Sequence, residues 1–438
     1  MRQRSLSRGR RDADRRRRSD QRRAPAADRA GHRRSADRHR RRPARRVLGR
    51  PRPRRALSDG VRAFPARRRA GHGPAPLHQG RGALMAYVAT RGGERAIEQS
   101  QRLYRDEMGT ISPDRVAEIR AAMPYLIDRV MGEASLYDED LAALALAQTG
   151  GELYEAILLL RAWRTTQPRL CVAEPVTQEW LFTHRRISAA FKDIPGGQLL
   201  GPTLDYAHRI LATEVLSGQD HVPDPVDPAD APAPAHQPSV AAWQAENGLL
   251  TAAAPDDTTG NDIPDITREP LLFPAKRAHT LQSLARAETG GVLALGYAAQ
   301  RGYGQAHPTV NELRLAEAEV VVTHPRGTRF SAGRVKISQA EVVDKKGDAL
   351  RLGFAATMGW NEVKVIAAAT LDLNAEGAPK GAPTEEEFFL YHTEGVESSG
   401  FCIHFKLPHY VTFQSSLDAM RDAKAKRAAT EKQPEPAE

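Results

Sequence analysis

Residues 319–337 read EVVVTHPRGTRFSAGRVKI, and this stretch decides the fold class of the 438-residue chain. Both of its ends are strand-like, and HPRG at residues 324–327 has the composition of a turn, so we expect a β-hairpin. Helical patterns follow near residues 361–373 and 385–396. Strands flanked by helices predict an α+β fold.

Upstream of the hairpin, residues 85–216 have a helical pattern. Ser112 followed by Pro113 is typical of a helix start. The apolar stripe that follows contains Pro124, which predicts a kink. Further helices are expected at residues 138–148, 152–166 and 204–216. These patterns predict a helical N-terminal domain.

Residues 217–264 are rich in proline, alanine and aspartate. Such a composition buries too little apolar area to offset backbone entropy, so we expect a mobile linker with one docking helix at residues 239–250. The linker leads into a mixed strand and helix domain over residues 265–424. A charged tail, residues 425–438, ends the chain.

The first 84 residues carry most of the positive charge. They hold 29 of the 64 lysines and arginines, all of them arginine, and six of the 54 acidic residues, a net charge of +23. Because the whole chain is +10, residues 85–438 are acidic, at −13, which disfavours nucleic-acid binding. We expect residues 1–84 to be disordered. Their lack of lysine fits a mis-assigned start, with Met85 as the native one; the alternative is a genuine basic tail.

The compartment is indicated by what the sequence lacks. It has no continuous apolar stretch of the kind found in signal peptides and membrane spans. Cys171 and Cys402 are the only cysteines and lie far apart. We therefore expect a cytoplasmic protein without a disulfide framework.

The first candidate site is RRISAAFKDIPGGQLLGPTLDYAHR, residues 185–209. Gly196 and Gly197 would let the backbone approach a ligand closely, before a helix whose first turn exposes N–H groups to phosphate. Three cations precede the loop: Arg185, Arg186 and Lys192. An ordinary connector with glycine caps is the alternative.

Two carboxylates flank this loop. Asp193 and Asp205 could hold a ribose hydroxyl or a magnesium ion, or could serve only as helix caps and salt-bridge partners. A second candidate is QRGYGQAHP, residues 300–308, where Arg301 and Tyr303 suit phosphate and a nucleobase. Its alternative is a helix C-terminus with glycine at the stop signal.

A third candidate is FCIHFKLPHYVTFQ, residues 401–414. Apolar and polar residues alternate up to Pro408, so we expect a strand followed by a turn. His404 and His409 would then lie close enough to share a metal ion. The alternative is a pair of ordinary surface or core histidines.

Four blocks of the chain together resemble the PhnI family, a core subunit of the bacterial carbon–phosphorus lyase system. They are YVATRGGERAI, RRISAAFKDIPGGQLLGPTLDY, ALGYAAQRGYGQAHP and GFCIHFKLPHYVTFQ. The resemblance runs from Met85 to about Leu417. The arginine-rich leader and the proline-rich linker depart from the family pattern.

The resemblance implies a nucleosidase-like transferase of phosphonate catabolism. Acting with PhnG, PhnH and PhnL, the family displaces adenine from MgATP with an alkylphosphonate at the ribose anomeric carbon. The product is alpha-D-ribose 1-methylphosphonate 5-triphosphate, and the subunit alone is associated with purine nucleosidase activity. PhnJ, a radical S-adenosylmethionine enzyme, joins the hetero-oligomer and later cleaves the carbon–phosphorus bond.

This chemistry gives each candidate residue an expected role. Carboxylates favour the positive charge that builds on the ribose, so Asp193 and Asp205 are candidates for catalysis. The residues expected to bind the nucleotide and its Mg²⁺-bound phosphates are Arg185, Arg186, Lys192, Gly196, Gly197, Arg301 and Tyr303. The resemblance also associates the HxKLPH segment, with His404 and His409, with a zinc ion (Zn²⁺) shared with PhnJ. Cys402 lies outside that motif.

The competing interpretation is a non-catalytic scaffold that assembles and positions the carbon–phosphorus lyase subunits. Two features favour this interpretation. No motif in the chain is specific enough to define a complete active site, and the chain is rich in amphipathic surface. Turnover of ATP by the isolated chain separates the two interpretations.

Overall fold

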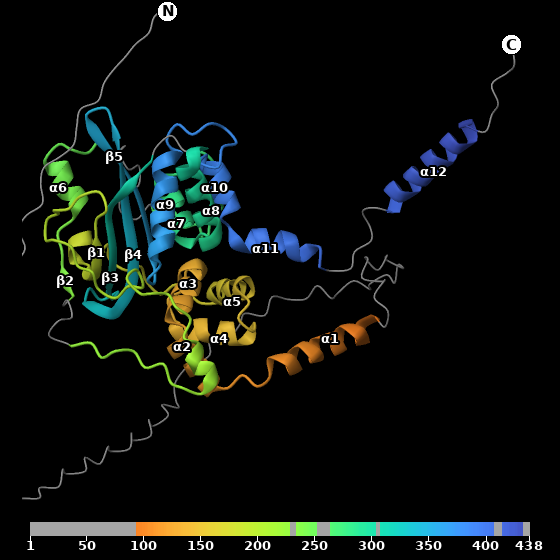
Figure 1. Ribbon diagram of the computed structural model, residues 1–438, viewed down its shortest axis with the longest axis horizontal. Coiled ribbons are helices and arrows are strands. Elements are labelled where there is room, and N and C mark those ends of the chain that lie inside the picture. The colour runs from red at the N-terminus through yellow and green to blue at the C-terminus, as the bar shows by residue number, and fades with distance from the viewer. Residues whose placement is uncertain (1–92, 228–233, 252–262, 304–306, 407–413, 432–438) are drawn as a thin grey trace, which may run out of the picture. The chain divides into compact units, whose positions relative to one another are not determined.

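The computed structural model describes residues 93–227, 234–251, 263–303, 307–406 and 414–431. These residues form one antiparallel sheet of five strands, in the order β2-β1-β3-β4-β5, with helices packed against it (Figure 1). The predicted α+β fold class is therefore confirmed. Within the described part of the chain, no helix is long and apolar enough to cross a membrane. The arginine-rich leader and His409 lie outside the described residues.

The predicted hairpin forms the centre of the sheet. Its turn is closed by His324 N donating to Thr328 O at 2.9 Å and by Gly327, with φ +88°, donating to His324 O at 2.8 Å. The strands are much longer than the sequence pattern indicated, and a third long strand, β5, follows. The strand bounds are β1 Phe182–Ile187, β2 Ala235–His236, β3 Thr309–Thr323, β4 Arg329–Lys346 and β5 Ala349–Met358.

Most of the predicted helices are present. The helix bounds are α1 Gly93–Met108, α2 Pro113–Ala122, α3 Pro124–Ala134, α4 Glu139–Gln148, α5 Leu153–Thr165, α6 Val240–Glu246, α7 Arg277–Arg286, α8 Thr289–Ala298, α9 Glu362–Ala375, α10 Glu386–His392, α11 Gly395–His404 and α12 Gln414–Glu431. Ser112 caps α2, accepting from Arg115 N at 3.2 Å. Pro124 starts a new helix, because Met123 before it leaves the helical region (φ −128°, ψ 49°).

Two apolar clusters hold the helices in place. In one, α7 and α9 pack on a face of the sheet, and α8 and α10 pack against these helices, through residues such as Leu313, Leu371 and Phe389. A Cβ at Gly353 of β5 would lie 2.3 Å from Ala369 O, so β5 and α9 approach as closely as their backbones allow. The second cluster joins α3, α4 and α5. The helix α6 contacts β3, and its N-cap Ser239 was predicted correctly as the start of a docking helix.

Two predictions about the first half of the chain are wrong. Residues 85–216 are not all helical, because they contribute β1, which pairs with β3 from the second half. No helix runs over residues 204–216, where only a short 3₁₀ turn, Thr213–Ser217, is present. Arg209 has φ +54°, which a right-handed helix cannot contain. Asp205 forms an ion pair with Arg185.

Candidate functional site

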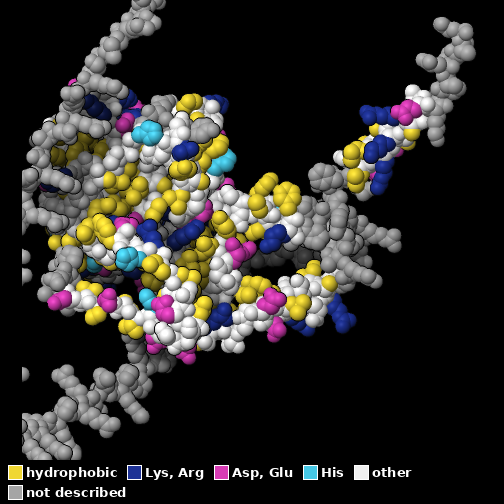
Figure 2. Space-filling view, viewed as in Figure 1, with side chains coloured by type: hydrophobic (Ala, Val, Ile, Leu, Met, Phe, Trp, Pro, Cys, Tyr) yellow, Lys and Arg dark blue, Asp and Glu magenta, His cyan; other side chains and the backbone are white. Residues whose placement is uncertain are grey.

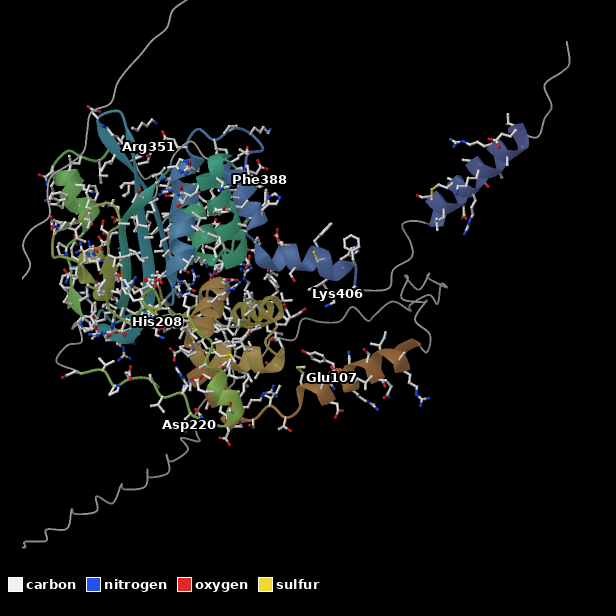
Figure 3. All side chains as sticks on the ribbon, viewed as in Figure 1. Glu107, His208, Asp220, Arg351, Phe388 and Lys406 are labelled. Atoms are coloured by element: carbon white, nitrogen blue, oxygen red, sulfur yellow. The ribbon has the colours of Figure 1, made fainter. Side chains whose placement is uncertain are left out.

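A cavity of about 310 Å³ opens between α3, residues 202–209 and the start of α9, and we call it the Asp205 cavity. Figure 2 shows basic and acidic side chains side by side where α3 meets α7 and α9, and Figure 3 labels His208 on the segment beside α3. The cavity is at the small end of the range for ligand pockets. Its lining is Tyr125, Arg129, Pro202, Thr203, Leu204, Asp205, Arg209, Thr289, Leu315, Trp360, Asn361, Glu362, Val363 and Lys364.

Arg185, on β1, holds two carboxylates at the wall of this cavity. Its Nη2 donates to the Asp205 carboxylate, and its Nε donates to Glu362 Oε1 at 2.6 Å. Its Nη1 donates to Leu200 O at 2.7 Å. The Arg185 side chain is 2% exposed, whereas those of Asp205 and Glu362 are 53% and 24% exposed. The cavity therefore presents the carboxylate oxygens, and the guanidinium lies behind them.

Arg186 lies on the opposite face of the sheet, because neighbouring strand residues point to opposite sides. It is fully buried. Its hydrogen bonds go to Glu312 Oε1 at 3.0 Å, Pro195 O at 2.7 Å, Gly197 O at 2.8 Å and Pro238 O at 2.9 Å. The sheet therefore separates the two arginines that the sequence analysis grouped as phosphate ligands.

Lys364 contributes a buried cation to the lining. It is 1% exposed, and its Nζ donates to Ala285 O at 2.7 Å. Burial lowers the pKa of Lys364 to about 8, and the nearby Arg129 acts in the same direction, while Glu133 opposes it. The ammonium can therefore give up its proton more readily than an exposed lysine does.

Arg129, on α3, lies beside Lys364 in the lining. Its Nε donates to Glu133 Oε1 at 2.9 Å and its Nη2 to Glu288 Oε1 at 2.7 Å. Glu288 also caps α8, accepting from Gly290 N at 2.8 Å. No described residue accepts from Arg129 Nη1. This nitrogen has donor capacity left for a ligand.

Trp360 closes the cavity on the side of the sheet. Its ring centroid lies 5.4 Å from the ring of His184, and Lys336 Nζ lies 5.5 Å from the same centroid. The indole Nε1 is buried and finds no acceptor among the described residues. Trp360 therefore lines the cavity with an indole N–H that has no acceptor, while His184 and Lys336 lie against its ring.

The glycine-rich loop packs on protein rather than framing the cavity. A Cβ at Gly196, where φ is +80°, would lie 2.3 Å from Gln237 Oε1. Lys192 and Asp193 are exposed, and neither lines the Asp205 cavity. Because no helix follows the loop, the helix N-terminus expected to receive phosphate is absent from residues 204–212.

Arg301 and Tyr303 belong to a single π-helical turn, Ala299–Tyr303, after α8. The exposed guanidinium of Arg301 lies 5.8 Å from the ring centroid of Tyr297. Arg301 does not line the Asp205 cavity. Gly302 in this turn has φ +114° and follows the C-terminus of α8, as the alternative expected; the ligand-binding role stays a prediction.

The strand predicted at residues 401–407 is wrong, because α11 runs through His404. Phe401 and Phe405, four residues apart, lie edge to face at 5.3 Å, a contact that helical geometry provides. His404 is exposed at the end of α11, two residues before Lys406, which Figure 3 labels. Within the described ranges, no three His, Cys, Asp or Glu residues are grouped to hold a metal ion.

Sequence reasoning missed the residues that complete the cavity: Arg129, Trp360, Glu362 and Lys364. One signal was available, since Lys364 interrupts the apolar run from Val363 to Ala369. A lysine on a buried helix usually has a specific partner or role. Arg129, Trp360 and Glu362 lie in no recognisable motif, and only the folded structure shows that they line one cavity.

Comparison with known proteins gives a consistent result. A family model described as bacterial phosphonate metabolism protein (PhnI) matches residues 86–427. The putative C-P lyase subunit protein HtxH of Stutzerimonas stutzeri is 40% identical over 79% of this chain and 98% of its own length. The alpha-D-ribose 1-methylphosphonate 5-triphosphate synthase subunits PhnI of Rhizobium meliloti and Escherichia coli are 39% and 40% identical. Each covers 76% of this chain, and 94% and 97% of their own lengths are matched.

Proposed function

Since the chain belongs to the PhnI family of bacterial phosphonate metabolism proteins, we propose that it is a synthase subunit that displaces adenine from MgATP with an alkylphosphonate. The product would be alpha-D-ribose 1-methylphosphonate 5-triphosphate, the compound in the names of its Rhizobium and Escherichia relatives. Purine nucleosidase activity of the subunit alone belongs to the same proposal, because water would then replace the phosphonate.

One observation carries the proposal: Arg185 holds Asp205 and Glu362 together at a cavity that also contains Lys364. Breaking the N-glycosidic bond builds positive charge on the ribose, and two fixed carboxylates stabilise that charge. The leaving adenine needs a proton or a hydrogen bond. Lys364, with a pKa of about 8, is protonated at neutral pH and suited to that role.

The triphosphate requires cations and the magnesium ion that arrives with ATP. Arg129, with its unused Nη1, and Arg209, 68% exposed beside Asp205, are the candidates of the cavity for contact with the triphosphate. Lys192 and Arg301 are exposed and do not line the cavity, so a role for them requires that the triphosphate extend beyond it. Tyr303 stays a candidate for contact with the nucleobase.

We place partners and zinc in the same proposal. The partners are PhnG, PhnH, PhnJ and PhnL, in line with the names of the relatives, which mark them as subunits. Zinc would be bound by His404 and His409. His404 offers one exposed imidazole at the end of α11, and the described residues supply no further cluster of ligands. The remaining ligands would come from His409 and a partner subunit, and the zinc would act there as a Lewis acid.

The test is adenine release from MgATP by the full chain, with and without methylphosphonate and the partner subunits. We expect Glu362→Gln and Asp205→Asn to slow release about 100-fold, since losing one preorganised electrostatic group typically costs that much. Asp193→Asn removes an exposed carboxylate outside the cavity and is the matched control. Equal rates in all three variants would remove the Asp205 cavity from the mechanism. No release under any condition would favour the scaffold.

A further inference from the structure

A larger cavity, of about 510 Å³, lies between α5, residues 266–271, α7 and the turn from α10 to α11, and we call it the Arg164 cavity. It shares no lining residue with the Asp205 cavity. Much of its wall is apolar, from Leu158, Ile266, Leu271, Leu390 and Val396. Three arginines also line it: Arg161, Arg164 and Arg286.

The three arginines differ in how well they are satisfied. Arg161 donates to the Glu394 carboxylate and, through Nε and Nη2, to Glu133 O at 3.1 and 2.8 Å. Arg164 and Arg286 donate no hydrogen bond to any residue that the structure describes, and the Nε of each is buried. Each guanidinium carries five N–H donors. The donors of Arg164 and Arg286 are therefore available to a ligand in this cavity.

No carboxylate of the lining compensates this pair fully. Glu394 is 3.8 Å from Arg286 Nε, beyond hydrogen-bonding distance, and is already bound by Arg161. Glu269 lies 3.4 Å from the imidazole of His279. Glu397 is exposed on α11. Asp265 opposes the loss of charge on Arg164, but it pairs with Arg169 at 2.6 Å.

The pKa values of the two arginines are consistent with this lack of compensation. Burial, together with the neighbouring Arg161, lowers the pKa of Arg286 to about 10. Burial also lowers the pKa of Arg164. A bound anion would oppose both effects.

We propose that the Arg164 cavity binds a phosphate or phosphonate group that carries a small organic substituent. Arg164 and Arg286 would donate to its oxygens, because the guanidinium fork matches the spacing of oxygens on a tetrahedral oxyanion. The apolar wall would receive the substituent, and the volume leaves room for one. Since this cavity is separate from the Asp205 cavity, the inference does not depend on the proposed reaction.

The first test is calorimetric titration of the full chain with methylphosphonate. We expect Arg164→Gln and Arg286→Gln each to weaken binding about tenfold or more, as loss of a charge-assisted hydrogen bond usually does. Arg421→Gln removes an exposed arginine from α12, which lines neither cavity, and is expected to leave binding unchanged. No binding, or equal affinity in all variants, would overturn the proposal.

A thermal-shift measurement separates binding from folding. Because Arg164 has no hydrogen-bonding partner in the described chain, Arg164→Gln is expected to keep or raise the Tm without ligand. It should also abolish the rise in Tm that methylphosphonate causes in the unmodified chain. A variant that lowers the Tm but keeps the full ligand-induced rise would contradict the proposal.

A third comparison identifies the class of ligand. A neighbouring cavity shares Arg164 and adds Arg169 and Arg268, which would suit a chain of phosphates. We expect methylphosphonate to bind more tightly than inorganic phosphate and tripolyphosphate. Tighter binding of tripolyphosphate, weakened by Arg169→Gln, would replace the organic substituent with a polyphosphate chain and overturn that part of the proposal.

Discussion

Glu341, on β4, is buried in a polar cluster on the face of the sheet that also holds Arg186. Its carboxylate accepts from Gln178 Nε2 at 2.8 Å and from Asn311 Nδ2 at 3.0 Å. Burial, together with the nearby Glu312, raises the pKa of Glu341 to about 7. The folded chain therefore keeps a proton here at pH values where the unfolded chain has lost it.

We expect the free energy of unfolding to fall as the pH rises from about 4.5 to 7, because the folded state binds the extra proton in that window. For a shift from 4.5 to about 7, this group contributes at most about 3 kcal/mol. Glu341→Gln should flatten this dependence and stabilise the protein at pH 8. Urea unfolding between pH 5 and 8 measures both effects.

The glutamine substitution can be accommodated by the existing network. Gln178 Oε1 is buried without a hydrogen-bond donor among the described residues, so a flipped Gln178 amide can accept from the new side chain. An unchanged pH dependence in Glu341→Gln would show that other groups cause it.

Arg185 offers a second test at the scale of one residue. Arg185→Met would leave Asp205 and Glu362 close together without their shared cation, and we expect a loss of about 3 kcal/mol of stability. Arg334→Met is the control, since Arg334 is 55% exposed and its pair with Glu317, at 3.5 Å, should contribute less than about 1 kcal/mol. Urea unfolding at pH 7 compares them, and equal losses would contradict the role given to Arg185.

At the scale of elements, the contact of β5 with α9 depends on Gly353. A Cβ there would lie 2.3 Å from Ala369 O and 2.5 Å from Leu373 Cβ, so one element must move. We expect Gly353→Ala to cost about 1–3 kcal/mol, the usual range for overpacking. Thermal unfolding followed by circular dichroism measures this.

A glycine-to-alanine substitution in α11 should instead raise the stability of the protein. Gly400 lies inside the helix, and a methyl group added there would meet no described neighbouring element within 4 Å. Gly400→Ala is expected to stabilise α11 by up to about 1 kcal/mol, as alanine does in helix interiors. A loss of stability would instead support the strand expected from the alternating sequence.

The alternation at residues 401–407 misled because the same residues also satisfy a helical spacing. Phe401 and Phe405 are two strand repeats apart and also one helical turn apart. The helix is favoured by Glu394, whose carboxylate accepts from Val396 N at 3.2 Å at its start. A seven-residue pattern cannot distinguish a strand from a helix. The N-terminal cap at Glu394 and the packing of α11 against α5 favour the helix.

At the scale of the whole molecule, the pairing of β1 with β3 joins residues that the sequence assigned to separate domains. Neither half can complete the sheet alone, so we expect one cooperative unfolding transition for the described body. Tryptophan fluorescence and far-ultraviolet circular dichroism should give coincident urea curves. Two separated transitions would restore the picture of independent domains.

The sequence alone determined the α+β class, the central hairpin, the starts of several helices and the family. These depend on local patterns: a turn signal between strand-like segments, a serine before a proline, and four ordered blocks. The sequence also identified Arg185 and Asp205 as candidates, because charged residues that flank a glycine-rich loop can be recognised without a structure. The structure places these two in one ion pair.

Only the tertiary structure decided what surrounds that pair. Glu362 lies 177 positions from Arg185 in the chain, and their hydrogen bond exists because β1 and the start of α9 meet at the same end of the sheet. The separation of Arg185 from Arg186 follows from which face each side chain takes. So does the position of the two arginines of the Arg164 cavity whose buried Nε atoms make no hydrogen bond to a described residue. Local sequence fixes the period of an element, but burial against distant elements fixes which side chains meet and which charges stay uncompensated.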